Sequence, residues 1–161
     1  MTERDGEHVS RRAPERGAIL VCRIATRLCA LPVGVVIETM RRLPVEPIAG
    51  APPFVAGLAI IRGEPVPVVD AARLLGAEPG QASRFVTLRT APRPIALAVD
   101  DVLGVHRLAP GALVALPALA GALAGDAVAA IGALEARLLM VLETARLVPP
   151  AVFELVERAA S

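Results

Sequence analysis

The feature that most restricts how this chain can fold is a succession of short runs rich in valine, isoleucine and leucine, each ended by proline, glycine or a charged turn. Such runs are typical of short strands joined by tight turns. They predict three strands within residues 18–43 and further strands at 55–61, 65–69, 85–89, 94–99, 102–108, 127–134 and 137–142. Because no helical pattern alternates with them, we expect a mainly β protein, a barrel or a sandwich.

Two short helices are also expected. Asp70 stands directly before the sequence AARLL, where its carboxylate can cap a helix that Gly76 then ends. Pro149 and Pro150 are suited to the start of a terminal helix. The apolar side of that helix is expected to carry Val152, Leu155 and Val156.

The chain of 161 residues suits one folded unit built from two lobes. Residues 1–17 are polar and charged and are expected to form a disordered tail, without a signal peptide. Residues 18–161 then form the folded part, in which each half supplies roughly five strands. We expect the two lobes to divide near the linker at 77–83, a proline-rich connection at 44–53, and a loop or mobile segment at 112–127.

Composition excludes several classes of protein. The net charge is +1, and the aromatic residues are three phenylalanines, so neither a basic groove nor a set of stacking platforms for nucleic acid is present. The apolar stretch 108–134 is interrupted by Pro110, Pro117 and Asp126, so no membrane insertion is expected. Two cysteines do not make a disulfide framework, and a cytoplasmic location fits best.

Catalytic and metal-binding constellations are scarce. The serines lie in the tail, in a linker and at the extreme terminus, so a Ser-His-Asp triad is not expected. His106 alternates with apolar residues and is interpreted as a rim histidine rather than a metal ligand. Asp100 and Asp101 point to opposite faces of a strand, so a turn is favoured over a shared carboxylate site. Cofactors and metals are therefore not expected.

Cys22 and Cys29 lie on either side of the turn Ala25-Thr26. If that turn is a tight hairpin, the two thiols face each other across neighbouring strands. They are interpreted as buried reduced thiols, with a disulfide or a metal pair as the alternatives.

The stretch "GLAIIRGEPVPVVDAARLLG", residues 57–76, resembles the signature of the CheW family, the adaptors of bacterial chemotaxis arrays. Other segments agree in the same order, including Val36 and Glu38 in "VVIETM", "IALAVDDVLGVHRL" and the last hairpin, so that the resemblance covers residues 18–148. The residues that match the signature are Gly57, Ile61, Arg62, Gly63, Pro67, Val68, Val69 and Asp70.

The resemblance implies two five-stranded SH3-like β-barrels packed together and a non-catalytic adaptor without a cofactor. It implies that one barrel surface docks the regulatory domain of a CheA-type histidine kinase and that the groove between the barrels holds the cytoplasmic tip of a methyl-accepting chemoreceptor. The alternatives are a coupling protein of a pilus or another chemosensory-like pathway, and a small-ligand-binding barrel. The residues assigned to partner binding are Val36, Glu38, Gly57, Ile61, Arg62 and Gly63, and those assigned to the structural motif are Pro67, Val68 and Asp70.

The chain departs from the family at Ile60, where the family pattern has asparagine, and at Cys22 and Cys29, which replace aromatic residues of the first hairpin. These departures are typical of a divergent paralogue. Strand alternation predicts that Ile60 and Val68 point into the first barrel. Arg62 is expected at the barrel rim with a carboxylate or carbonyl partner, for which Glu38 and Asp70 are the leading candidates. Its role is structural, in partner recognition, or both.

Overall fold

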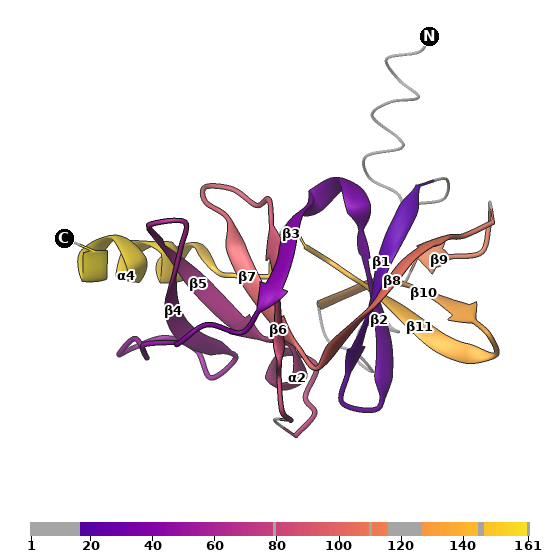
Figure 1. The fold of residues 1–161 in the computed structure, drawn as a ribbon, viewed down its shortest axis with the longest axis horizontal. Coiled ribbons are helices and arrows are strands. Elements are labelled where there is room, and N and C mark those ends of the chain that lie inside the picture. Colours follow the sequence, from indigo (N-terminus) through magenta and orange to yellow (C-terminus); the bar gives the residue numbers. More distant parts are fainter. Residues whose placement is uncertain (1–16, 79, 110, 116–126, 145–146, 161) are drawn as a thin grey trace, which may run out of the picture.

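The computed structural model describes residues 17–78, 80–109, 111–115, 127–144 and 147–160, and these form two barrel-like lobes that lie side by side (Figure 1). The tail expected at residues 1–17 and the segment expected at 112–127 lie largely outside the described residues. The helical elements are η1 (Val33–Val35), α2 (Ala71–Leu74) and α4 (Pro150–Ala160). The strands are β1 (Ala18–Ile24), β2 (Arg27–Pro32), β3 (Val36–Arg41), β4 (Val55–Ile61), β5 (Glu64–Asp70), β6 (Arg84–Leu88), β7 (Ile95–Val99), β8 (Asp101–Arg107), β9 (Val114–Ala115), β10 (Val128–Leu134) and β11 (Arg137–Leu142).

Each lobe is built on one curled sheet. The first sheet has the strand order β8-β1-β2-β11-β10-β9, and the second has the order β3-β6-β7-β5-β4. The expected fold class, a mainly β protein of two packed SH3-like lobes with short helices and a C-terminal helix, is confirmed, although the two-residue strand β9 gives the first sheet a sixth member.

The chain passes between the two lobes more than once. It leaves the first sheet after β2, builds the whole second sheet from β3 to β7, and returns to the first sheet with β8. The division expected near 77–83 therefore does not separate the sheets, because β6 and β7 follow that linker and pair with strands that precede it. Local turns cannot reveal this, since the parallel pairs β2–β11 and β5–β7 join distant parts of the chain.

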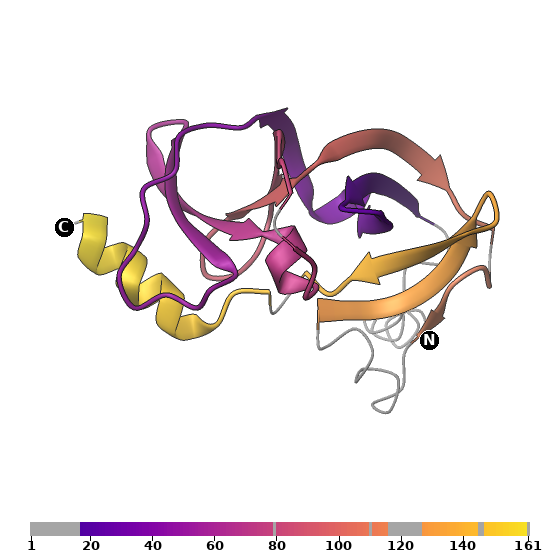
Figure 2. The same cartoon turned by 90° about the horizontal axis from the view of Figure 1, so that it is seen from below.

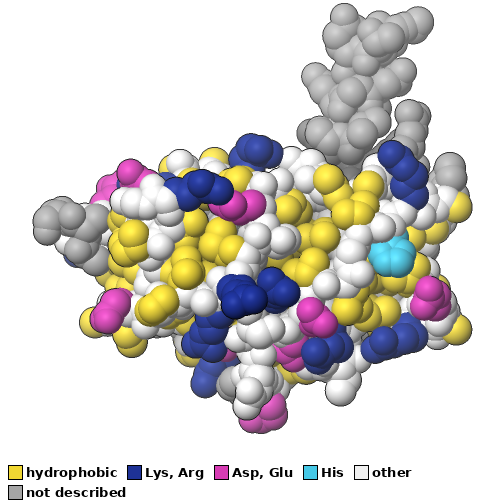
Figure 3. Space-filling model, viewed as in Figure 1, with side chains coloured by type: hydrophobic (Ala, Val, Ile, Leu, Met, Phe, Trp, Pro, Cys, Tyr) yellow, Lys and Arg dark blue, Asp and Glu magenta, His cyan; other side chains and the backbone are white. Residues whose placement is uncertain are grey.

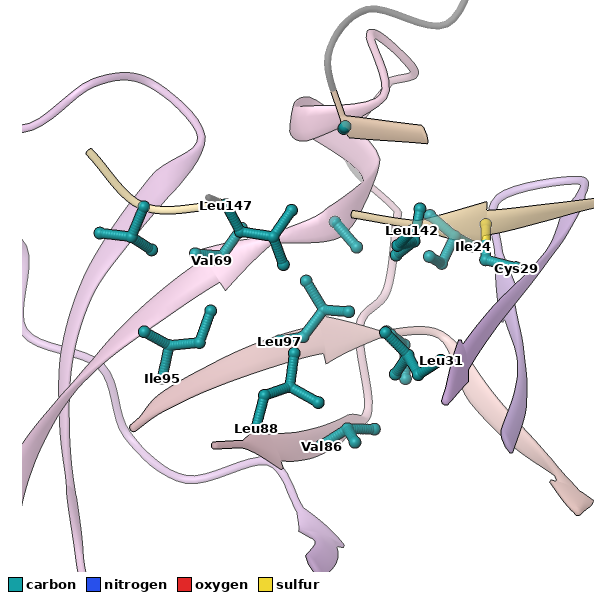
Figure 4. Packing of buried hydrophobic residues seen from close by; sticks show 14 of the residues in the cluster. Ile24, Cys29, Leu31, Val69, Val86, Leu88, Ile95, Leu97, Leu142 and Leu147 are labelled. Atoms are coloured by element: carbon teal, nitrogen blue, oxygen red, sulfur yellow. The ribbon is translucent and has the colours of Figure 1, made fainter. Parts of the chain in front are cut away.

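The two lobes share one large hydrophobic cluster. Figure 4 shows Val69, Val86, Leu88, Ile95 and Leu97 of the second sheet directed toward one another, with Ile24, Cys29, Leu31 and Leu142 of the first sheet further along the same cluster. Two smaller clusters lie elsewhere, one in the first sheet and one in the second. Burial of apolar surface in the large cluster is the main force that holds the two lobes together.

The C-terminal helix α4 returns to the second lobe and packs against β5, at the end of the molecule away from the first sheet (Figure 2). Val152 and Val156 are buried as expected, and Leu155 is half-buried. Phe153 also enters the large cluster, although the sequence analysis did not include it.

The shorter elements match their sequence signals. The Asp70 carboxylate accepts hydrogen bonds from the backbone N–H groups of Ala72 at 3.0 Å and Arg73 at 3.3 Å, so it caps α2 as expected. Gly76 ends this helix with φ +75°. Cys22 and Cys29 are paired across the first hairpin, and both are free and buried.

Within the described ranges, no helix combines the length and the apolar character needed to cross a lipid bilayer. The same residues bring no group of three or more histidine, cysteine, aspartate or glutamate side chains into an arrangement that could hold a metal ion.

Candidate partner-binding surface

The β4–β5 hairpin presents an arginine at its turn. Ile61 pairs with Glu64, so Arg62 and Gly63 form a two-residue loop. Both have positive φ, at 53° and 82°, as the common two-residue hairpin turn requires. Asparagine and glycine are the residues that this turn favours, so the backbone alone does not account for an arginine here.

The Arg62 guanidinium reaches across to β3. Its Nε–H donates to Glu38 Oε2 at 2.7 Å and its Nη2–H donates to Glu38 Oε1 at 2.8 Å. This two-point pairing fixes the plane of the guanidinium. Of the two partners expected for Arg62, Glu38 is therefore confirmed, while Asp70 caps α2 instead.

The pair is ordered yet open to solvent. The Arg62 side chain is 77% exposed and the Glu38 side chain 26% exposed. The hydrogen bond from Arg62 lowers the pKa of Glu38, and the same bond raises the pKa of Arg62, so both groups are charged at neutral pH. A guanidinium has five N–H donors. The donors that Glu38 does not use can therefore meet a carbonyl or carboxylate of a partner.

Other residues expected to bind partners do not present side chains. Ile61 is 7% exposed and packs in the smaller cluster of the second sheet. Gly57 is buried with φ +147°, and a Cβ on it would lie 2.0 Å from the carbonyl oxygen of Glu46. Val36 is half-buried against the large cluster. Of the structural motif, Pro67 and Val68 are buried and Asp70 is half-buried.

The expectation for Val68 is correct, since it is buried, but the expectation for Ile60 is wrong, since its side chain is 64% exposed. Of the residues from Leu58 to Ile61, it is Ala59 and Ile61 that are buried. The run Leu58-Ala59-Ile60-Ile61 is apolar throughout and does not reveal which face is buried. The face is set by a register shift between Val55 and Gly57, which pairs Ala59 with the buried Val66.

Ile60 lines an apolar groove beside β4. The groove encloses about 720 Å³ between the β4–β5 hairpin and the proline-rich connection that precedes β4. That connection is held to β4 by two backbone hydrogen bonds between Glu46 and Leu58, each 2.8 Å long. The residues lining the groove are Leu43, Pro44, Glu46, Pro47, Ile48, Ala49, Leu58, Ile60 and Pro65.

A second apolar surface lies where the two lobes meet. Strands β3 and β8 are edge strands of their sheets and lie on the same side of the molecule in Figures 1 and 2. Figure 3, which views this side, shows hydrophobic side chains across its middle, interrupted by arginines. The exposed apolar residues on and next to these strands are Val33, Ile37, Leu103 and Val105.

These residues are not among those that the sequence assigns to partner binding, although the pattern carries a signal for two of them. Leu103 and Val105 are two residues apart on one strand, so their side chains are expected on the same face of the sheet. Nothing in the sequence shows that Glu46, twelve residues before Leu58, closes the groove.

A comparison with protein-family models matches the CheW-like domain over residues 18–151 of this chain. The chain belongs to the CheW family. This is the family of chemotaxis scaffold proteins to which the signature in residues 57–76 pointed.

The CheW-like fold is also found among solved structures. The crystal structure of the scaffolding protein TtCheW from Thermoanaerobacter tengcongensis superimposes with a TM-score of 0.74 at 21% sequence identity. The match covers 82% of this chain and 92% of that chain. A comparison with curated protein sequences gives no match.

Proposed function

We propose that this CheW-like protein is a non-catalytic adaptor that couples chemoreceptors to a CheA-type histidine kinase in a chemotaxis-like pathway. The observation that carries the proposal is the Glu38–Arg62 pair, which is charged, held in two-point geometry and open to solvent. A pair that served only to stabilise the fold would gain little at such an exposed position.

The two apolar surfaces supply the rest of the proposed interaction. The groove beside Ile60 lies next to the turn that carries Arg62, since Ile60 pairs with Pro65 and Ile61 with Glu64. An apolar pocket beside an exposed arginine is typical of the centre of a protein interface. We assign this surface to the kinase regulatory domain, and the apolar surface between β3 and β8 to the receptor tip.

The proposed site of action is the cytoplasmic face of receptor arrays, to which the protein is recruited by its partners rather than by insertion into the membrane. Gly63 belongs to the surface assigned to the kinase, as the exposed end of the β4–β5 turn. Val36, half-buried against the shared cluster, supports that surface from the start of β3 without presenting its side chain to a partner. Gly57 and Ile61 contribute by shaping the hairpin beneath it.

The test is a calorimetric titration of the full chain with the regulatory domain of a CheA-type kinase from the same genome, followed by a titration with a receptor tip fragment. Binding at micromolar concentrations is expected for the kinase domain. Arg62→Ala should weaken it about 5- to 150-fold, as truncation of an interface arginine does. Arg158→Ala, which removes an exposed arginine from α4, is the matched control and should bind normally.

Two outcomes would contradict the proposal. One is the absence of binding to every such kinase domain and receptor fragment at micromolar concentrations. The other is equal binding by the wild type and the Arg62 variant, which would show that the Glu38–Arg62 pair does not take part in the interface. Binding only to the kinase of a pilus-associated gene cluster would support an adaptor that serves a pilus pathway instead of flagellar chemotaxis.

A further inference from the structure

Strand β3 contains a β-bulge immediately before Glu38. Val36 pairs with Leu88 of β6 and Glu38 pairs with Thr87, so two steps along β3 correspond to one step along β6. Ile37 is the extra residue, and it is 43% exposed. A bulge of this kind redirects the side chains that follow it.

The bulge places Val36 and Glu38 on opposite faces of the sheet. Val36 and its partner Leu88 belong to the large cluster shared by the lobes. Two residues further on, Met40 and its partner Phe85 belong to the smaller cluster of the second sheet. Residues two apart on a regular strand share a face, so Glu38 lies on the Met40 face and Val36 does not. Without the bulge, Glu38 would follow Val36 toward the shared cluster.

A single side chain bonds the main chain at this bulge. The Thr87 hydroxyl accepts a hydrogen bond from the Glu38 N–H at 3.1 Å and donates one to the Glu38 carbonyl oxygen at 3.2 Å. Thr87 is 3% exposed and is one of two buried polar residues in the described part of the chain. One hydroxyl thus bonds both the N–H and the carbonyl oxygen of Glu38, the residue that directly follows the bulge.

We infer that Thr87 is the positioning residue of the partner-binding pair: its hydroxyl holds the β3 bulge and so directs the Glu38 carboxylate at the Arg62 guanidinium. Thr87 touches neither Arg62 nor a partner in this role and acts through Glu38. The effect of Thr87 on the geometry of the Glu38–Arg62 pair is inferred from the hydrogen bonds and the strand register alone. The link from the pair to partner affinity rests on the proposed adaptor function.

The first experiment compares Thr87→Val, which keeps the shape of the side chain and removes the hydroxyl, with Thr87→Ser, which keeps the hydroxyl. The readout is the NMR signal of the Arg62 Nε–H, which its bond to Glu38 should shift and protect from exchange with water. Thr87→Val should lose this signature and Thr87→Ser should retain it.

Val86→Ala separates positioning from loss of stability, because Val86 directly precedes Thr87 in β6 and belongs to the shared cluster. It should lower the melting temperature while leaving the Arg62 signal in place. Thr39→Val, at an exposed position of β3, should change neither property. An unchanged signal in Thr87→Val, or an equal loss of the signal in Val86→Ala, would overturn the inference.

A measurement on the wild type does not depend on the folding of any variant. The Thr87 hydroxyl proton should exchange slowly and show a cross-peak to the Glu38 amide proton, and its absence would also overturn the inference. In the kinase titration, Thr87→Val should weaken binding at least about fivefold. If the wild type binds no kinase domain, the adaptor proposal fails, while the Arg62 signal still decides the role of Thr87.

Discussion

Replacing Gly57 by alanine tests whether the groove beside β4 depends on a close backbone approach. The added Cβ would lie 2.0 Å from the carbonyl oxygen of Glu46 and 2.9 Å from the Cα of Pro47, and both are backbone atoms that cannot rotate away. The φ of +147° is, in addition, a conformation that side chains rarely adopt. We therefore expect the Glu46 segment to be displaced from β4.

The magnitude follows from two terms. Backbone strain at such a φ costs about 1–3 kcal/mol. The two hydrogen bonds between Glu46 and Leu58, both 2.8 Å long, contribute about 0.5–1.5 kcal/mol each. The expected loss in the free energy of unfolding is therefore about 2–6 kcal/mol. For a chain of this length, the melting temperature should fall by roughly 4–24 °C.

Thermal unfolding measures the loss of stability of the whole protein. Amide hydrogen exchange shows whether the loss begins at the Glu46 segment, since the N–H groups of Glu46 and Leu58 should both lose protection. Gly34→Ala is the matched control, because Gly34 has no atom within 4 Å of its added Cβ. It should leave the melting temperature almost unchanged. A fall of less than 2 °C in Gly57→Ala, or equal falls in the two variants, would refute this reasoning about steric approach.

Asp70→Ala removes the cap of α2 and should lower the free energy of unfolding by about 0.5–2 kcal/mol. Thermal unfolding should then show a melting temperature lower by roughly 1–8 °C, and an unchanged melting temperature would show that the cap is redundant. Cys22 and Cys29 are buried, and burial raises the pKa of each thiol to about 12. Thiol labelling of the native protein at pH 8 should therefore be much slower than labelling of the protein unfolded in urea. A content of about one metal ion per chain would contradict the interpretation as free buried thiols. The pKa of Glu38 is lowered from 4.5 by its bond with Arg62, so the stabilisation from the pair is complete above pH 4.5 and is lost as the pH falls through the lowered value. An NMR titration of the Glu38 carboxyl should show a midpoint that rises toward 4.5 in Arg62→Ala, and identical midpoints in the two proteins would argue against the pairing.

Much of the local structure could be predicted from the sequence, and the reasons are local. The hairpin at Ala25-Thr26 and the cap at Asp70 depend on residues within a few positions of one another. The cost of an unpaired guanidinium predicts a carboxylate or carbonyl partner for Arg62, and it makes Glu38 and Asp70 the leading candidates. The choice between the two needed the sheet, since Glu38 is brought to Arg62 by strands that are not neighbours in the sequence order.

The chain alone is enough to predict the mainly β class, the positions of the strands and turns and, through the signature in residues 57–76, the CheW family. These depend on residue preferences and on short-range spacing, which a single chain displays directly. The three-dimensional structure was needed to show that Ile60 faces solvent, that Glu46 closes the groove beside β4, and that the Thr87 hydroxyl bonds the main chain of Glu38. The physical reason is strand register, because a bulge in one strand reverses the faces of the residues beyond it, and only the pairing of strands distant in sequence reveals where the bulge lies.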